Sequence, residues 1–531
     1  MSRNSTELAD QAIERGHALE DAGHFASALD CYLEALRCSP EYPRAHLNAG
    51  NALRLLRRHA DAEAAFREAI RRDPEYAEAH FNLSMLLAID ERRVEARMAL
   101  QHVLELQPAM IDKVLDAESY LLFSSAFRED ADPDVVAREH FRVGALIARA
   151  AGPPYSSWSN VPDPDRKLRI GYVSGDFAPH PVALFLRPMI EQRDRQHFDL
   201  YCYSNSDDNN PIAAKIRQQI DGWRPIAGAS DADVAERIRS DGIDVLVDLS
   251  GYTERNRLGV FARHPAPIQV TWLGYLNTTG LPTVAYRVCD SHTDPPGETE
   301  TFHAERLFRM PHSQWCYRPW DGISPSAASD DARGDRIVFG SLNQSIKISE
   351  PCVDLWSRVL LRVPKARLLV LDIRDAHVGA AIADALSRRG VGRDRIELHP
   401  RRSMTDYYAA IGAIDIALDT YPHNGATTTF DALWTGVPVV ALRGKRGISR
   451  SSYSIMRTLG MTELIADSPQ DYVDINVRLA FDATWRKEMR LMLPERLRTS
   501  PLMDARRFAR DLEAGYRRMW RSWCEVQSGR A

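Results

Sequence analysis

The sequence predicts an all-α array of helical repeats followed by two α/β lobes, each a doubly wound parallel sheet. A period of 34 residues runs through residues 1–108, which indicates stacked helix pairs. Short apolar segments then alternate with helix-compatible segments over residues 165–325 and again over 335–500. With 531 residues, 44% of them hydrophobic, the chain has enough apolar material for several cores.

The repeats are marked by Pro40, Pro74 and Pro108, which recur every 34 residues and each close a pair of predicted helices. Small and bulky residues recur in phase in the three units: Gly16, Ala28, Tyr32 and Ala35; Gly50, Ala62, Phe66 and Ala69; Ser84, Ala96, Leu100 and Val103. This is the pattern of tetratricopeptide repeats, here at about residues 9–40, 43–74 and 77–108. Small residues let paired helices approach closely, while the aromatic side chain fills the gap between neighbouring repeats.

Two asparagines, Asn48 and Asn82, also stand one period apart, on the same face of successive first helices. They are interpreted either as solvated helix polarity or as contacts to the backbone of an acceptor polypeptide in the groove of the repeats. The pattern leaves both interpretations open.

Residues 109–164 are predicted to be a helical extension that ends in a linker, GPPYSSWSNVPDPD. In the first lobe, the segments KLRIGYVSGD, FDLYCYS, IDVLVDLSG and IQVTWLGY are almost wholly apolar, as buried parallel strands are. In the second lobe, RIVFGSLNQ, ARLLVLDI, RIELHP, AIDIALDT and VPVVAL repeat that pattern, and residues 501–531 are helical by spacing. Two such lobes form a cleft at the carboxyl ends of their strands, which is the usual ligand site.

Composition excludes several classes of protein. The 73 acidic and 68 basic residues are intermixed, so a nucleic-acid partner is not expected. No apolar run approaches the ~20 residues of a membrane span, and the first residues have no apolar signal segment, so we expect a cytoplasmic protein without membrane contact. The seven cysteines never form a C-x-x-C pair, which indicates reduced thiols. No D-x-D pair follows a strand in the lobes, so no metal is expected.

The segment 415–440 has the most features of a binding site. A strand leads into a loop with Asn424 and Gly425, and Thr427 and Thr428 then open a helix. A helix start offers unsatisfied N–H groups and a favourable dipole, which suit a pyrophosphate, although an ordinary threonine N-cap fits equally well. Asp431, about one turn into the helix, is expected to accept ribose hydroxyls or to complement the helix dipole.

Two further segments end strands at the predicted cleft. Gln344 and Lys347 follow the first strand of the second lobe, where the lysine is predicted to be either a solvated surface charge or half of a phosphate clamp. His180 lies between two prolines at the rim of the first lobe, where we expect it to take part in proton transfer rather than to be structural.

Four motifs together resemble one known family. They are G-Y-V-S-x-D-F-x-x-H-P, P-A-P-I-Q-x-x-W-L-G-Y, G-S-L-N-Q-x-x-K and L-D-T-x-P-x-N-G-x-T-T-x-x-D-x-L-W-x-G-x-P. With the repeats, they resemble the O-GlcNAc transferase and SPINDLY family of GT-B glycosyltransferases over nearly all of residues 9–525. The resemblance implies that the second lobe binds a nucleotide sugar, that the repeats hold acceptor proteins, and that the reaction inverts the anomeric centre without a metal or other cofactor.

The same resemblance assigns roles to single residues. It places Gln344 and Lys347 at the diphosphate, with Thr427 and Thr428 completing that cradle, Asp431 at the ribose, and Gly274 near the donor sugar. Asn424 and Gly425 are also expected to bind the nucleotide sugar. His180 matches the active-site histidine, as a general base or as an orienting group. Lys347 is expected to stabilise the departing nucleotide.

The sequence departs from the animal O-GlcNAc transferases near the base and the sugar. Met404 and Tyr407 replace a lysine and a histidine that face uridine, so Tyr407 is expected to stack on the base. His423 and Ala426 replace residues close to the sugar. The prediction is transfer of N-acetylglucosamine from UDP-GlcNAc to Ser or Thr. Alternatives are another donor such as GDP-fucose, a bacterial surface or flagellar acceptor, a small-molecule or Asn acceptor, and a non-catalytic repeat scaffold.

Overall fold

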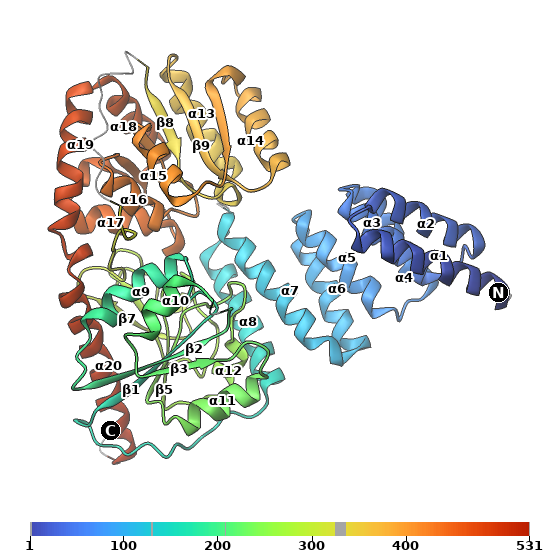
Figure 1. The fold of residues 1–531 in the computed structure, drawn as a ribbon, viewed down its shortest axis with the longest axis horizontal. Coiled ribbons are helices and arrows are strands. Elements are labelled where there is room, and N and C mark those ends of the chain that lie inside the picture. The colour runs from blue at the N-terminus through green and yellow to red at the C-terminus, as the bar shows by residue number, and fades with distance from the viewer. Residues whose placement is uncertain (1–2, 129–130, 208, 324–335, 530–531) are drawn as a thin grey trace. The chain divides into compact units, whose positions relative to one another are not determined.

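The computed structural model describes residues 3–128, 131–207, 209–323 and 336–529 (Figure 1). The chain divides into two compact units, Met1–Leu121 and Leu122–Ala531. The predicted lobe boundaries at residues 325 and 335 lie outside the described residues. None of the helices in the described ranges combines the length and the apolar character that crossing a membrane requires.

The first unit consists of helices that pair in sequence order. They are α1 (Arg3–Asp21), α2 (Phe25–Cys38), α3 (Pro43–Leu55), α4 (His59–Arg72), α5 (Ala77–Ile89) and α6 (Arg93–Leu106). The turn η1 (Pro108–Met110) and α7 (Ile111–Ser124) follow, and the unit ends within α7 at Leu121. Tyr32 and Phe66 are fully buried. A Cβ atom on Gly16 would lie 2.3 Å from the Tyr32 ring, and one on Gly50 would lie 2.5 Å from the Phe66 ring. The close helix packing that the repeat pattern predicts is therefore confirmed.

The second unit begins at the end of α7 and continues with the short turn η2 (Ser125–Phe127) and helix α8 (Pro133–Ala151), which packs on the first lobe. His140 of α8 is buried, and its Nε2 lies 2.8 Å from the hydroxyl of Tyr275. A Cβ atom on Gly144 would lie 2.2 Å from the carbonyl oxygen of Gly280, so the helix and the loop meet backbone to backbone. The last helix of the predicted extension is thus an integral part of the α/β unit.

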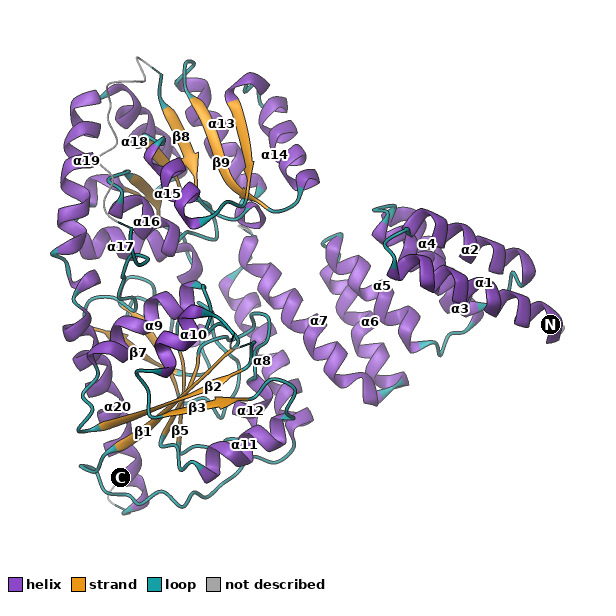
Figure 2. Ribbon diagram, in the orientation of Figure 1, coloured by secondary structure: helices purple, strands orange, loops and turns teal. Residues whose placement is uncertain are grey.

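The first lobe contains a parallel sheet, several of whose strands Figure 2 shows in orange. The strand order is β3-β2-β1-β4-β5-β6-β7. Its strands are β1 (Leu168–Ser174), β2 (Phe198–Ser204), β3 (Gly222–Pro225), β4 (Val245–Asp248), β5 (Ile268–Thr271), β6 (Tyr286–Asp290) and β7 (Arg306–Met310). Its helices are α9 (Pro181–Gln192), α10 (Pro211–Arg217), α11 (Asp231–Ser240) and α12 (Leu258–Ala262), with the turn η3 (Glu300–Phe302). The order reverses beside β1, which places the loop after this strand at the switch point of the sheet.

The second lobe repeats the architecture with the strand order β10-β9-β8-β11-β12-β13. Its strands are β8 (Val338–Ser341), β9 (Arg367–Ile373), β10 (Ile396–Pro400), β11 (Ile416–Leu418), β12 (Val439–Leu442) and β13 (Ile465–Ala466). Its helices are α13 (Glu350–Arg362), α14 (Ala376–Arg388), α15 (Met404–Gly412), α16 (Thr427–Trp434), α17 (Ser451–Leu459), α18 (Pro469–Phe481) and α19 (Ala483–Arg498). The switch point lies between β8 and β11. The segment after β8, which carries Gln344 and Lys347, and the segment that leads from β11 into α16 therefore meet there. The predicted fold class is confirmed.

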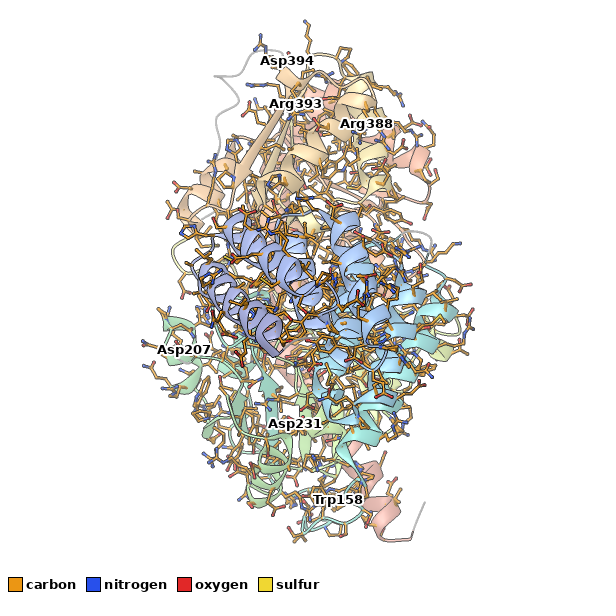
Figure 3. All side chains as sticks on the ribbon, turned by 90° about the vertical axis from the view of Figure 1, so that its right-hand side faces the viewer. Trp158, Asp207, Asp231, Arg388, Arg393 and Asp394 are labelled. Carbon is orange, nitrogen blue, oxygen red and sulfur yellow. The ribbon has the colours of Figure 1, made fainter. Side chains whose placement is uncertain are left out.

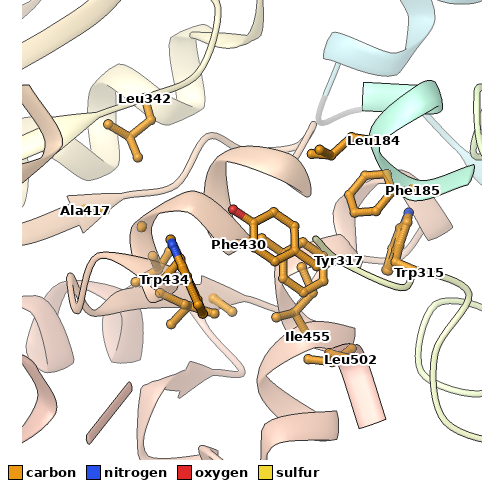
Figure 4. Packing of buried hydrophobic residues seen from close by; sticks show 14 of the residues in the cluster. Leu184, Phe185, Trp315, Tyr317, Leu342, Ala417, Phe430, Trp434, Ile455 and Leu502 are labelled. Carbon is orange, nitrogen blue, oxygen red and sulfur yellow. The ribbon is translucent and has the colours of Figure 1, made fainter. Parts of the chain in front are cut away.

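The last helix, α20 (Ala505–Gln527), returns from the second lobe to the first. Its Tyr516 hydroxyl lies 3.4 Å from that of Tyr172 on β1, and its Glu513 carboxylate accepts from the backbone N–H of Asp194 at 2.9 Å. The Trp520 indole donates to the carbonyl oxygen of Asp163. The two lobes therefore share one apolar core, part of which Figure 4 shows.

Charged side chains lie mainly on the surface of the unit, where acidic and basic groups form local pairs. Arg393, which Figure 3 labels, pairs with Asp384 in the second lobe, and both side chains are exposed. Exposed pairs of this kind contribute little to the free energy of unfolding, about 0–1 kcal/mol each. In the first lobe, the partly buried Asp231 accepts from Arg257 at 2.8 Å.

Candidate active site

A buried carboxylate organises the loop at the switch point of the second sheet. Asp419 follows β11, is 5% exposed, and accepts hydrogen bonds at Oδ1 from the backbone N–H groups of Thr420 and Gly425, both at 2.8 Å. The amide of Asn343, at the end of β8, reaches the same oxygen at 3.3 Å. Burial raises the pKa of Asp419 to about 6. The carboxylate thus fixes the loop that leads to α16 against the end of β8.

Lys347 lies against this loop. Its Nζ donates to the carbonyl oxygen of Asn424 at 3.2 Å, and Asn424 is only 2% exposed. Burial lowers the pKa of Lys347 to about 8, against the opposing attraction of Asp419. The interpretation of Lys347 as a solvated surface charge is therefore wrong. The half-buried cation loses hydration that an anionic ligand would replace.

The start of α16 lies beside Lys347. The N-cap residue is Ala426, which makes no side-chain cap, so the interpretation as an ordinary threonine N-cap is wrong. The Thr428 hydroxyl instead donates to Oδ1 of Asn343 at 3.0 Å. A Cβ atom on Gly425 would lie 2.2 Å from Oγ1 of Thr428, so glycine allows this close turn. N–H groups at the helix start are thus available to an anion.

The opposite face of α16 is anchored in the core. The Phe430 ring stacks on Tyr317 with ring centroids 4.8 Å apart and planes at 6°, as Figure 4 shows. Phe185 of α9, in the first lobe, packs against the same Phe430 ring with centroids 5.7 Å apart. Both contacts hold the helix start in a fixed position between the two lobes.

Asp431 is buried in a cluster of tyrosines. Its Oδ1 accepts from the hydroxyls of Tyr317 and Tyr408, both at 2.7 Å, and its Oδ2 accepts from Tyr407 at 3.2 Å. Burial raises the pKa of Asp431 to about 6, while the tyrosine hydroxyls oppose the shift. Tyr407 is therefore tied to Asp431 in this structure. The ribose contact of Asp431 and the base contact of Tyr407 stay predictions.

His180 lies at the switch point of the first lobe, at the start of α9. Its Nδ1 accepts from the backbone N–H of Val182 at 3.4 Å and lies 3.6 Å from a carboxylate oxygen of Asp176. Burial lowers its pKa, Asp176 opposes the shift, and Arg255, Arg401 and Arg374 add to it. Because two of these arginines follow strands of the second lobe, the histidine faces that lobe. With Nδ1 as acceptor, the neutral ring carries its proton on Nε2.

The other predicted residues lie as follows. Gln344 is exposed next to Lys347, and Thr427 is half-buried at the helix start. A Cβ atom on Gly274 would lie 1.9 Å from the carbonyl oxygen of Leu249, so backbone packing within the first lobe already requires this glycine. In the repeat unit, Asn82 donates to Oδ1 of Asn51 at 2.9 Å, and Asn48 is 9% exposed. Their part in acceptor binding stays a prediction.

Several residues of the site were not predicted from the sequence. Asn343 and Asp419 lie inside the quoted motifs, and their position at strand ends was the available signal. Tyr317 reaches Asp431 from 114 residues away, and Arg374 and Arg401 approach His180 from the other lobe. Within the ranges that the structure describes, no group of three or more His, Cys, Asp or Glu side chains is placed to hold a metal ion.

The two parallel-sheet lobes and the helical repeats are those of a glycosyltransferase of the GT-B type that carries tetratricopeptide repeats. The model of glycosyl transferase family 41 matches residues 142–317 and 326–512, and a tetratricopeptide repeat model matches residues 13–76 and 56–110. The chain belongs to glycosyl transferase family 41.

Several relatives support the assignment. A probable UDP-N-acetylglucosamine–peptide N-acetylglucosaminyltransferase SPINDLY of Petunia hybrida is 36% identical over 378 residues, 70% of this chain and 40% of that protein. The SPINDLY protein of Arabidopsis thaliana is 35% identical over 70% of this chain and 42% of its own length. A SEC protein of Arabidopsis thaliana with the same printed activity is 28% identical over 74% and 42%. The chain thus spans about two fifths of the length of these curated relatives.

A solved structure matches over nearly the whole chain. It is a lysine-to-methionine variant of the O-GlcNAc transferase of Thermobaculum terrenum, 34% identical with a TM-score of 0.78, and the match covers 99% of this chain and 100% of that one. The repeats and the two-lobed fold are therefore shared with a bacterial relative.

Proposed function

We propose that this protein transfers N-acetylglucosamine from UDP-GlcNAc to Ser or Thr hydroxyls of other proteins, with inversion at the anomeric carbon and without a metal. The observation that carries the proposal is the half-buried Lys347 ammonium beside the uncapped start of α16. These groups provide positive charge and donors where a diphosphate would leave. The printed names of the relatives support the choice of donor and acceptor.

The chemistry follows from this arrangement. The acceptor oxygen forms a bond to the anomeric carbon as the bond from that carbon to the diphosphate oxygen breaks, and the hydroxyl proton is released to solvent. A single in-line displacement inverts the centre. Negative charge grows on the departing diphosphate, and Lys347, Thr428 and the N–H groups at the start of α16 stabilise it. They supply the charge that a divalent cation would otherwise provide, which is why we propose a metal-independent reaction.

His180 is proposed to orient the reactants. Its Nδ1 accepts from the Val182 N–H, and its lowered pKa keeps the ring neutral near pH 7, so Nε2 carries a proton. A protonated Nε2 donates a hydrogen bond and accepts no proton. We therefore assign His180 to holding an oxygen of the donor or acceptor, and not to general-base catalysis.

The acceptor protein is proposed to bind along the tetratricopeptide repeats. Asn82 and Asn51 form a hydrogen-bonded pair across successive repeats. Their remaining amide groups are of the kind that pairs with the backbone of an extended polypeptide.

The test combines donor binding and transfer. We would measure thermal unfolding with UDP, GDP and CMP, then transfer of labelled sugar from UDP-GlcNAc to Ser/Thr peptides, with and without EDTA. Stabilisation by UDP and transfer unaffected by EDTA are expected. Stabilisation by GDP alone would replace the proposed donor, loss of transfer in EDTA would refute metal independence, and no response to any nucleotide would favour a non-catalytic scaffold.

A further inference from the structure

Three tyrosines hold the Asp431 carboxylate, and they hold its two oxygens unequally. Tyr317 and Tyr408 both donate to Oδ1 at 2.7 Å, whereas Tyr407 donates to Oδ2 at 3.2 Å. Burial and the charge of Asp431 raise the pKa of Tyr407 well above its ordinary value, so this hydroxyl keeps its proton and is the donor. A carboxylate oxygen accepts roughly two hydrogen bonds. Oδ1 is therefore filled, and a further donor is received at Oδ2, beside Tyr407.

The three tyrosines also differ in exposure. Tyr317 is 1% and Tyr408 is 7% exposed, whereas Tyr407 is half-buried. Tyr407 lies in the first turn of α15, and residues 401–406 just before it are all exposed. Asp431 itself is 3% exposed, so its carboxylate is almost fully covered. Of the covering rings, Tyr407 is the one that can move at the least cost to the core.

The position of Asp431 on α16 makes this movement relevant to the nucleotide. Thr427 and Asp431 stand four residues apart and lie on the same face of the helix, about 6 Å apart along its axis. In a nucleoside diphosphate the ribose is bonded directly to the phosphate chain. A ligand with its diphosphate at the start of α16 can therefore bring its ribose hydroxyls, which are hydrogen-bond donors, to Oδ2 of Asp431.

We propose that Tyr407 is a gate on the nucleotide site: its hydroxyl holds Oδ2 of Asp431 while the site is empty, and its ring moves out when the ribose hydroxyls take that place. The exchange replaces one hydrogen bond by another, so Tyr407 lowers the affinity for the nucleotide. Return of Tyr407 to Oδ2 restores the lost bond when the nucleotide leaves, which favours product release. Because Tyr407 acts through Asp431, it is a positioning residue.

This inference rests on the proposed function, because it takes a nucleoside diphosphate as the ligand at the start of α16. A matched pair of variants tests it. Tyr407→Phe removes the donor to Oδ2, and Tyr408→Phe removes a donor to Oδ1 of the same carboxylate. Only the first variant frees the oxygen that the ribose hydroxyls are proposed to reach.

The measurement is calorimetry of UDP and of its dideoxy analogue, which lacks both ribose hydroxyls, with wild type and the two variants. Tyr407→Phe is expected to bind UDP about five-fold more tightly than wild type, because the ribose then gains its hydrogen bond without displacing another. The dideoxy analogue should gain nothing, and Tyr408→Phe should show no tighter binding of UDP. A change in packing alone would affect both nucleotides equally, so the comparison isolates the ribose hydroxyls.

Three results would overturn the gate: UDP binding to Tyr407→Phe that is equal to or weaker than wild type, an equal gain for the dideoxy analogue, or an equal gain in Tyr408→Phe. If wild type binds GDP and not UDP, the proposed donor is wrong, and GDP with its dideoxy analogue then tests the gate in the same way. If wild type binds neither nucleotide, the proposed function is contradicted and the gate falls with it. Nucleotide binding to wild type therefore tells the two failures apart.

Discussion

The ammonium group of Lys347 donates to the neutral carbonyl oxygen of Asn424 at 3.2 Å, and this contact is partly buried. An ammonium has three donors, so two remain for a ligand. A cation held by a neutral partner gains more from an arriving phosphate than one already paired with a carboxylate.

Replacing Lys347 with Met should abolish most turnover without harming the fold. Loss of a comparable donor to a developing charge lowers kcat by about 10²- to 10³-fold. Because the buried cation costs free energy in the empty protein, we expect the unfolding temperature to stay or to rise. The measurements are steady-state kinetics and thermal unfolding, with the exposed Lys365→Met as control. Equal turnover in both variants would refute the assignment.

The dependence of kcat/KM on pH should report the ionisation of Lys347. The pKa of Lys347 is lowered to about 8, so the ammonium is present below that pH and is lost above it. We expect kcat/KM for the donor to fall about tenfold per pH unit on the alkaline side.

The stability contribution of Lys347 has the opposite sign. Because the unfolded chain holds this proton up to its ordinary pKa, the folded state gains relative stability as pH rises through about 8. Urea unfolding between pH 7 and 10 tests this expectation, and the Lys347→Met variant should lack that contribution. If the rise in stability at alkaline pH persists in the Lys347→Met variant, another titrating group causes it.

The role of His180 can be tested by keeping only one of its nitrogens. In His180→Gln an amide donor replaces Nε2, so we expect kcat to fall less than about tenfold, whereas His180→Ala should fall by about 10²-fold. Equal losses in the two variants would indicate a base, because an amide cannot accept the proton.

The Oδ2 atom of Asp431 is expected to contribute to the affinity for the donor. Asp431→Asn should weaken UDP binding by about tenfold or more, since a charged acceptor contributes roughly 1.5–3 kcal/mol. Tyr317→Phe is the matched control, because it removes a bond to Oδ1 of the same carboxylate. Calorimetry of UDP binding should show little change for the control, and equal weakening in both would mean that Asp431 acts only by packing.

Two glycines should respond differently to alanine. At Gly274 the added Cβ meets the backbone oxygen of Leu249 at 1.9 Å, and a backbone atom cannot move aside. At Gly425 it meets the side chain of Thr428, which rotates at the expense of its bond to Asn343. We expect Gly274→Ala to lower the unfolding temperature and Gly425→Ala to weaken UDP binding. If Gly274→Ala weakened only UDP binding and Gly425→Ala lowered only the unfolding temperature, the roles assigned to both glycines would be wrong.

Local patterns predicted most of the fold. The repeats and the longer buried strands are visible because their periodicity is contained in contiguous residues. Four strands were missed for identifiable reasons. β7 is mostly half-exposed, β6 contains the buried Arg287, β3 ends in Pro225, and β13 has two residues. Each of these segments has a weak strand pattern of its own and pairs with a neighbouring strand of the sheet.

The site was predictable where its residues are contiguous. Asn424, Gly425 and Thr428 lie in one loop and helix start, and Lys347 follows the adjacent strand. What the sequence could not show is which residue caps α16 and what contacts Asp431, because loop geometry places Ala426 at the cap and Tyr317 comes from a distant segment.

The return of α20 to the first lobe has a consequence for synthesis of the chain. Phe508 stacks on Trp272 of the first lobe, and Tyr516 and Glu513 complete the packing around β1 and the Asp194 turn. Domains generally fold in order as they leave the ribosome. Here residues 505–527 complete the core of the first lobe only after the second lobe has been translated, so the nascent first lobe exposes apolar surface until then.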